Sequence, residues 1–243
     1  MRRLFVTGML IALAALLAPS PSYAQQTLNI SVGGFIPDGF GGRTRDDRGV
    51  SADVVRSDLD FLAFRIRDFN RAQVNAEYLV GLGDFLEAGL GVGFDKRTVP
   101  TVYADQVNSN GSEIEQELRL RTVPFTATLR FLPFGHSTAI EPYVGAGVAI
   151  VNWRYTETGD WVDPADNSIF TDTFTGSGTS TGPTILGGVR VPLGTFGIGG
   201  EIRWQDVKGD LPANLGFATT RTGQRPWIDL GGWSYLATFQ VHF

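Results

Sequence analysis

Apolar and polar residues alternate with a period of two along most of the chain after residue 27, a pattern typical of β-strands with two unlike faces. In 71–80, apolar residues fill every second position and Gln73, Asn75 and Glu77 lie between them. A tight turn at 81–84 leads into a second such segment, which predicts a hairpin. The alternation predicts eight strands, at 28–33, 71–80, 86–95, 118–131, 143–150, 184–193, 196–204 and 233–243.

The fourth predicted strand changes the parity of its apolar positions. Leu118 and Leu120 are even-numbered, whereas Val123 and the apolar residues after it are odd-numbered. We interpret the change as a β-bulge at 122–124, because the proline there removes a ladder donor and an extra residue restores the facing. The facing of the fifth strand, 143–150, stays open.

The connections between the predicted strands are of two kinds. The short ones are 81–84, 133–139 and 193–196, and the long ones, rich in Gly, Asp, Asn, Ser and Thr, are 37–68, 99–113, 157–181 and 207–228. Most strands have about ten residues, the length that crosses a bilayer when tilted. Short turns at one rim and long loops at the other predict an all-β fold, an eight-stranded antiparallel up-and-down transmembrane barrel without a free edge.

The first 24 residues do not fit this pattern. Two arginines precede the apolar stretch 4–17, and Ser-Tyr-Ala at 22–24 fits the site that signal peptidase cuts. We expect 1–24 to be a cleaved signal peptide and 25–243 to be the barrel domain. An uncleaved anchor is disfavoured, because the apolar stretch is shorter than the roughly 20 residues that span a bilayer.

Composition and charge exclude several classes of function. A net charge of −5 does not suit binding to nucleic acid, whose backbone requires neutralisation by Lys and Arg. Cysteine is absent, which excludes a disulfide framework and a thiolate metal site, and the two histidines are too few for a metal cluster. The sequence predicts no cofactor. No apolar stretch of helix length follows the signal peptide, so membrane insertion must use strands.

Alternation alone does not show which face of the barrel points inward. A soluble, lipocalin-like barrel would hold its apolar face inside. A membrane barrel is favoured because the polar face is rich in glycine with few charges, which suits a narrow lumen. Aromatic residues also gather toward strand ends, where interfacial girdles lie. They are Tyr78, Phe94, Phe131, Phe196, Trp204, Trp233 and Phe243.

Two motifs carry a resemblance to a known class of protein. Within the last strand, the segment from Tyr235 to Phe243 ends in Phe239-x-Val241-x-Phe243, which resembles the signal read by the outer-membrane assembly machinery. Pro-Tyr-Val-Gly-Ala-Gly at 142–147 is common in one strand of such proteins. The chain after residue 24 thereby resembles the eight-stranded OmpA, OmpX and OmpW type of barrel. These motifs are specific to the class and not to a function within it.

The resemblance implies a location in the outer membrane of a Gram-negative-type bacterium. It also implies outer-membrane lipid and the barrel-assembly machinery as partners. An extracellular partner is not indicated by any motif in the sequence.

The lumenal face carries six charged residues, three of each sign, in the half of the barrel toward the short turns. They are Glu77, Glu87, Arg130, Arg190, Glu201 and Arg203. Charges in so narrow a space must pair or stay hydrated. Arg190 and Glu201 flank the 193–196 turn and are expected to face each other across it. The layer fits either a gated channel or a structural plug, and we favour the plug.

The first long loop contains an apolar cluster among charged residues. Its members are Leu59, Phe61, Leu62, Phe64, Ile66 and Phe69. Apolar side chains on a surface loop usually need cover or a partner. The loop either extends the first hairpin above the membrane, which we favour, or lines a mouth for a small hydrophobic molecule, as the resemblance to OmpW implies.

Candidate sites for catalysis and for metal binding are weaker. His136 and Ser137 have residue types of a lipid A deacylase but lie in a short turn, and His242 lies at the same rim. An omptin-like protease needs acids and a histidine at the opposite rim, and the predicted strands place no histidine there. No enzymatic activity is therefore predicted. Three acids in the third long loop, Asp160, Asp163 and Asp166, lack the alternating spacing of a calcium loop and are expected to be solvated.

Overall fold

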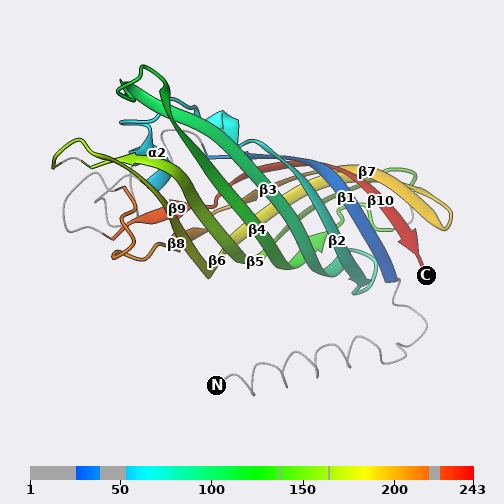
Figure 1. Ribbon diagram of the computed structural model, residues 1–243. Helices are drawn as coiled ribbons and strands as arrows, with labels where there is room; N and C mark the ends of the chain where they lie inside the picture. The colour runs from blue at the N-terminus through cyan, green and yellow to red at the C-terminus, as the bar shows by residue number, and fades with distance from the viewer. Residues whose placement is uncertain (1–25, 39–52, 137, 164, 219–224) are drawn as a thin grey trace.

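The computed structural model describes residues 26–38, 53–136, 138–163, 165–218 and 225–243 of the 243-residue chain (Figure 1). The expected signal peptide at 1–24 lies outside these residues.

Eight antiparallel strands close into a barrel (Figure 1). They are β1 (Gln26–Pro37), β2 (Arg71–Gly81), β3 (Leu86–Val107), β4 (Glu113–Phe131), β5 (Glu141–Val162), β6 (Ile169–Leu193), β7 (Phe196–Gln205) and β10 (Gly232–His242). Each strand pairs with the next one in this series, and β1 pairs with β10 to complete the ring. The eight predicted strands and the up-and-down barrel are therefore confirmed. The closed ring satisfies the backbone hydrogen bonds between the first and last strands.

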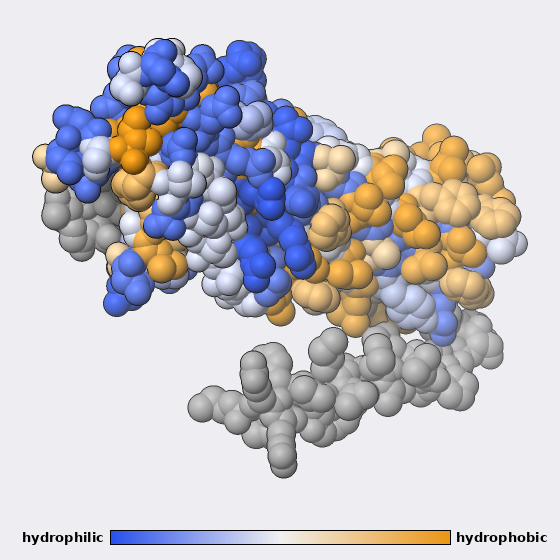
Figure 2. Space-filling view, viewed as in Figure 1, coloured by the Kyte–Doolittle hydropathy of each residue, from blue (hydrophilic) through white to orange (hydrophobic). Residues whose placement is uncertain are grey.

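The outer surface beside the short turns is a belt of exposed apolar side chains (Figure 2). Val32 on β1 is 52% exposed, Val92 on β3 43% and Val189 on β6 43%. On β5, Val144 and the even-numbered residues up to Ile150 face outward with them, which fixes the facing of this strand. The positions between them are mostly glycine, polar or charged and point into the lumen, with apolar exceptions such as Leu79, Leu186 and Leu236. The apolar face therefore points outward toward lipid, and the lipocalin-like alternative is excluded.

The bulge expected at 122–124 is wrong. β4 pairs with β5 without a register shift from Gln116 opposite Gly159 to Phe131 opposite Val144. Even-numbered residues point inward along the whole of β4. The apolar positions change parity because the surroundings change: the outward residues are charged up to Arg121 and apolar from Val123 onward. The strand leaves the lipid at this point and continues into water.

The connections expected at 99–113 and 157–181 are largely strand and not loop. β3 runs on to Val107 before β4 begins at Glu113, and β5 runs to Val162 before β6 begins at Ile169. The two hairpins project past the rest of the barrel at the upper left of Figure 1. Their polar composition suggested loops, but it reflects an outer face in water, while alternate residues still point inward.

The described parts of the other two long connections fold into the mouth of the barrel. The first contains helix α2 (Val54–Asp58) and the short helix η1 (Ile66–Phe69), and the last contains the strand pair β8 (Lys208–Asp210) and β9 (Trp227–Asp229). The Asp53 side chain caps α2 by accepting a 2.9 Å hydrogen bond from the backbone amide of Arg56. Among the described residues, no helix is long and apolar enough to cross a membrane.

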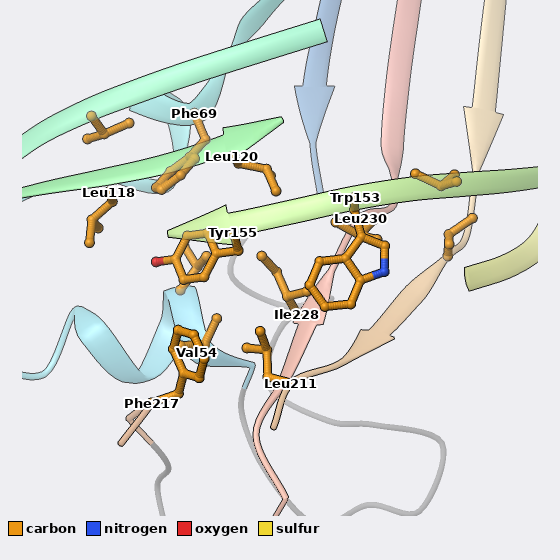
Figure 3. Packing of buried hydrophobic residues seen from close by; sticks show 14 of the residues in the cluster. Val54, Phe69, Leu118, Leu120, Trp153, Tyr155, Leu211, Phe217, Ile228 and Leu230 are labelled. Atoms are coloured by element: carbon orange, nitrogen blue, oxygen red, sulfur yellow. The ribbon is translucent and has the colours of Figure 1, made fainter. Parts of the chain in front are cut away.

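An apolar core fills the mouth between the projecting strands (Figure 3). Its buried members come from β3, β4 and β5 and from the two connections that fold into the mouth. They include Val54, Phe69, Leu118, Leu120, Trp153, Tyr155, Leu211, Phe217, Ile228 and Leu230. The barrel therefore reverses its polarity along its axis: the interior is polar within the apolar belt and apolar above it.

The position of the belt predicts different costs for a charge on two outward positions. Val92→Arg puts a guanidinium in the lipid and should cost about 2 to 4 kcal/mol of stability. Thr179→Arg, exposed on β6 above the belt, should change stability by about 0.5 kcal/mol or less. Urea unfolding of the protein in lipid vesicles measures both. Equal costs would contradict the assigned position of the membrane.

Candidate functional site

Ion pairs between side chains from different strands cross the lumen. At the level nearest the short turns, Arg190 of β6 donates to both carboxylate oxygens of Glu87 on β3, at 2.6 and 3.1 Å. Its Nε atom donates to Glu141 of β5 at 2.5 Å. All three side chains are at most 4% exposed. One guanidinium thus joins three walls of the barrel.

A second group of charges lies farther along the barrel axis. Arg130 of β4 donates to Glu77 of β2 and, at 3.0 Å, to Glu201 of β7. Arg203 donates to the same two carboxylates, at 3.3 Å to Glu77 and 2.7 Å to Glu201. The Tyr143 hydroxyl donates to Glu201 at 3.0 Å, and its ring lies 4.8 Å from the Arg130 guanidinium. The two guanidinium groups and the two carboxylates therefore form four ion pairs.

The six charges expected in the lumen are thus brought together as two groups, and not as one layer. Arg190 and Glu201 do not face each other across the turn, as had been expected. The register of β6 and β7 places Arg190 opposite Gly199 and Glu201 opposite Gly188, so the two charges lie at different levels. Each finds its partners on more distant strands.

Three further lumenal charges were not among the six. Glu141 completes the first group, and Arg71 pairs with Asp95 closer to the mouth. Arg71 also lies 4.1 Å above the ring of Phe35. Glu141 lies two residues before the predicted start of the fifth strand, so it was not assigned to the lumenal face. The parity of Arg71 and Asp95 within their strands was a sufficient signal.

Two glycines on β3 leave space for the charges. A Cβ atom on Gly89 would lie 2.8 Å from a Glu77 oxygen and 2.6 Å from the hydroxyl of Thr128. That hydroxyl donates a 3.0 Å hydrogen bond to Glu77. A Cβ on Gly91 would lie 2.7 Å from the hydroxyl of Thr126. The glycine-rich inner face is therefore required by the width of the lumen.

Two buried carboxyl groups meet in the apolar core of the mouth, outside the lipid. Asp58 at the end of α2 accepts a 3.1 Å hydrogen bond from the hydroxyl of Tyr155, and Glu157 is 1% exposed. Burial raises the pKa of Glu157 to about 8, and burial together with Glu157 raises the pKa of Asp58 well above its usual value. The pair therefore docks α2 against β5 with at least one carboxyl protonated at neutral pH.

The weaker candidates for catalysis and for metal binding contact other residues or lie outside the described part of the chain. Ser137 is outside the described residues, His136 contacts Arg190 at 3.1 Å, and His242 contacts Thr27 at 2.9 Å. In the part of the chain that the structure describes, no three His, Cys, Asp or Glu side chains are grouped to hold a metal. The acids Asp163 and Asp166 each accept a hydrogen bond from a backbone amide two residues later in the 163–168 turn.

The residues of the expected assembly signal lie along the outward face of β10, with Phe243 directly after its end. Tyr235, Phe239 and Phe243 are exposed within the apolar belt, with Val241 between the last two. Phe239 stacks on Phe196 of the neighbouring strand, with ring centroids 5.7 Å apart.

The closed ring, the outward apolar belt and the polar lumen together decide the type of molecule. The chain is an eight-stranded transmembrane β-barrel of the outer-membrane type. No protein-family model and no curated protein matches its sequence.

Three solved structures that resemble this barrel are distant from it in sequence. Neisserial surface protein A matches with a TM-score of 0.44 and 11% identity, over 90% of this chain and 99% of that one. A major outer membrane protein from Thermus thermophilus matches with a TM-score of 0.45 and 12% identity, over 90% and 99%. Ail, the attachment invasion locus protein of Yersinia pestis, gives 0.39 and 9%, over 91% and 99%. These likenesses are too distant to carry an inference about function.

The Arg190 contacts predict a large effect of removing that charge. Arg190→Met keeps most of the side-chain volume but strands two buried carboxylates, which should cost about 3 to 5 kcal/mol. Arg119→Met breaks an exposed ion pair with Glu117 and should cost about 1 kcal/mol or less. Unfolding in urea measures both variants. Adding Glu87→Gln to Arg190→Met should recover part of the loss, and its failure to do so would contradict the pairing.

The buried acids predict that α2 loosens as the pH rises. The folded mouth holds a proton on Glu157 that the opened mouth releases, so the free energy of opening should fall from about pH 4.5 to about pH 8 and level off above that. The total loss should be about 3 to 5 kcal/mol. Amide hydrogen exchange of 54–58, corrected for intrinsic rates, measures it. Glu157→Gln should reduce the pH dependence to the part that Asp58 contributes, whereas Glu115→Gln, exposed on β4, should leave it unchanged.

Proposed function

We propose that this chain is a non-enzymatic outer-membrane protein whose lumen is closed and whose projecting hairpins act at the cell surface. The observation that carries the proposal is the set of ion pairs across the lumen. Arg190, Arg130 and Arg203 each contact two carboxylates from other positions on the wall. An ion crossing the barrel would have to separate buried pairs, at about 3 to 5 kcal/mol for each.

The space left beside these pairs supports the same proposal. A cavity of about 10 Å³ lies between Gln73, Glu77 and Arg203. That volume is about the minimum that holds one water molecule. Steady ion conduction needs a continuous path of water, so a cavity of this size favours a closed barrel.

The mouth offers a second barrier, of different chemistry. Val54 of α2, Phe69 of η1 and Ile228 of β9 are buried in the apolar core that fills it. Removing them from this core would expose apolar surface to water, at about 25 cal/mol for each Å². A transported solute would have to displace this core as well as the ion pairs.

The residues predicted to line a mouth for hydrophobic molecules instead pack against other side chains. Leu62 is 2% exposed, Phe61 lies 5.6 Å from the Tyr103 ring, and Phe64 lies 5.8 Å from the Phe69 ring. The backbone here also pairs with β3, since Ala63 donates to Val102 at 2.9 Å. The loop thus adds to the edge of β3 and does not lengthen the first hairpin. This packing disfavours the passage of hydrophobic molecules.

The projecting hairpins are the surface that remains for a partner outside the cell. Apolar side chains are exposed at their tips, with Val107 at 62% and Ile169 and Phe170 at 41% each. Exposed apolar residues on a polar surface are typical of contact sites for other macromolecules. A structural or adhesive role places function at these tips and leaves the barrel as their anchor.

Planar-bilayer recording of the unmutated protein tests the closed lumen. We expect no steady conductance, because the pairs and the core both block the path. A large, stable conductance that responds to Arg190→Ala would overturn the proposal and favour a channel.

Uptake of an apolar dye into vesicles tests the alternative. Uptake that is lost in Phe61→Ser/Phe64→Ser but kept in Val107→Ser/Phe170→Ser would favour passage of hydrophobic molecules. No uptake above that of protein-free vesicles is the result expected for a closed barrel.

A further inference from the structure

Four cations gather on the outer wall of the barrel where β3, β4 and β5 leave the apolar belt. Lys96 lies opposite Arg121, and Arg121 lies opposite Arg154. Arg119 points to the same side two residues from Arg121. Side chains directly opposite each other on adjacent strands are neighbours, and like charges in this arrangement repel. We call Lys96, Arg119, Arg121 and Arg154 the basic cluster.

The basic cluster has little negative charge around it. Arg119 pairs with Glu117, and in the described part of the chain the other three cations form no ion pair with a carboxylate. Apart from Glu117, the nearest outward neighbours on these strands are uncharged, such as Thr98, Asn152 and Thr156. Every lumenal arginine described above contacts an acid. An anion from outside the chain would relieve the repulsion within the basic cluster.

The height of the basic cluster on the barrel indicates which anion. On β3 the outward residue before Lys96 is Phe94, which is 49% exposed, and on β4 the outward residue after Arg121 is Val123. Two residues along a strand span about 6 to 7 Å. The cations therefore lie just above the hydrocarbon, at the level of lipid headgroups. In Figure 2 the hydrophilic surface likewise adjoins the apolar belt directly.

The cations and two neighbouring side chains surround a hollow of about 340 Å³. Its walls are Phe94, Lys96, Arg119, Arg121, Arg154 and Thr156. This volume is within the range of small-molecule sites. The Arg121 guanidinium lies 6.0 Å from the ring of Phe94, which holds it beside the hollow. Guanidinium groups bind phosphate through paired hydrogen bonds, and the lysine adds a point charge.

We propose that this hollow binds the phosphate groups of an anionic lipid headgroup in the leaflet on the long-loop side of the membrane. The apolar floor at Phe94 continues into the belt, so a bound headgroup leaves its acyl chains against the barrel wall. A free phosphate ion would use the cations but not this floor. The inference depends on the position of the belt and not on whether the lumen is closed.

Lipid binding to the full chain in dodecyl maltoside, a detergent without phosphate, tests the proposal. Bisphosphorylated lipid A is the ligand, and native mass spectrometry measures its retention. Lys96→Gln/Arg154→Gln should lower the affinity at least about tenfold, because two charge-assisted contacts are lost. Arg56→Gln/Arg225→Gln makes the same change in net charge on the connections that carry α2 and β9 and not on the wall of the hollow, and it should bind as the unmutated protein does.

A second measurement separates binding from folding. Without lipid, Lys96→Gln/Arg154→Gln should unfold at the same temperature as the unmutated protein or higher, because repulsion is relieved. With lipid, only the unmutated protein and the control should gain stability. Equal lipid affinity in all three proteins would overturn the proposal. Equal binding of the dephosphorylated lipid, or displacement of lipid A by inorganic phosphate at equal concentration, would overturn its assignment to a lipid phosphate.

Discussion

A strand in hydrocarbon finds no water for its peptide groups, so the sheet must close on itself, and the rest of this structure depends on that closure. The pairing of β1 with β10 completes the ring and makes the lumen narrow enough for side chains to meet across it. Arg190 reaches Glu87 from a strand 103 residues away in the sequence. The glycines of β3 are the counterpart of these long side chains, because the lumen has room for one or the other at each level.

The same strands pass through two surroundings, lipid and water. Within the belt, lipid surrounds the wall, so apolar side chains point outward and polar ones fill the lumen. Above the belt, water surrounds the wall, so charges point outward and an apolar core fills the mouth. β4 passes from one regime to the other between Arg121 and Val123 without any change in its pairing. The acid pair of Asp58 and Glu157 lies in the second regime, where its burial ties the docking of α2 to pH.

Charged side chains have different surroundings inside and outside the barrel wall. In the lumen, each arginine is held by acids, because an unpaired buried charge would cost more than the pairing yields. On the outer wall, the basic cluster tolerates repulsion because its side chains reach solvent, and it leaves those cations available to an external anion. The same residue types thus form ion pairs across the lumen in one place and, as we propose, bind lipid headgroups in the other.

The alternation of residues by itself determined the eight strands and which residues of a strand share a face, because a period of two is a property of each segment alone. It did not separate a bulge from a change of solvent at 122–124, since both shift the parity of apolar residues. The alternation also predicted loops at 99–113 and 157–181, where the structure has hairpins whose outer face lies in water. The partners of Arg190, the burial of Glu157 beside Asp58 and the row from Lys96 to Arg154 depended on register between strands. Register is set by pairing across the closed ring, so only the tertiary structure decided which side chains meet.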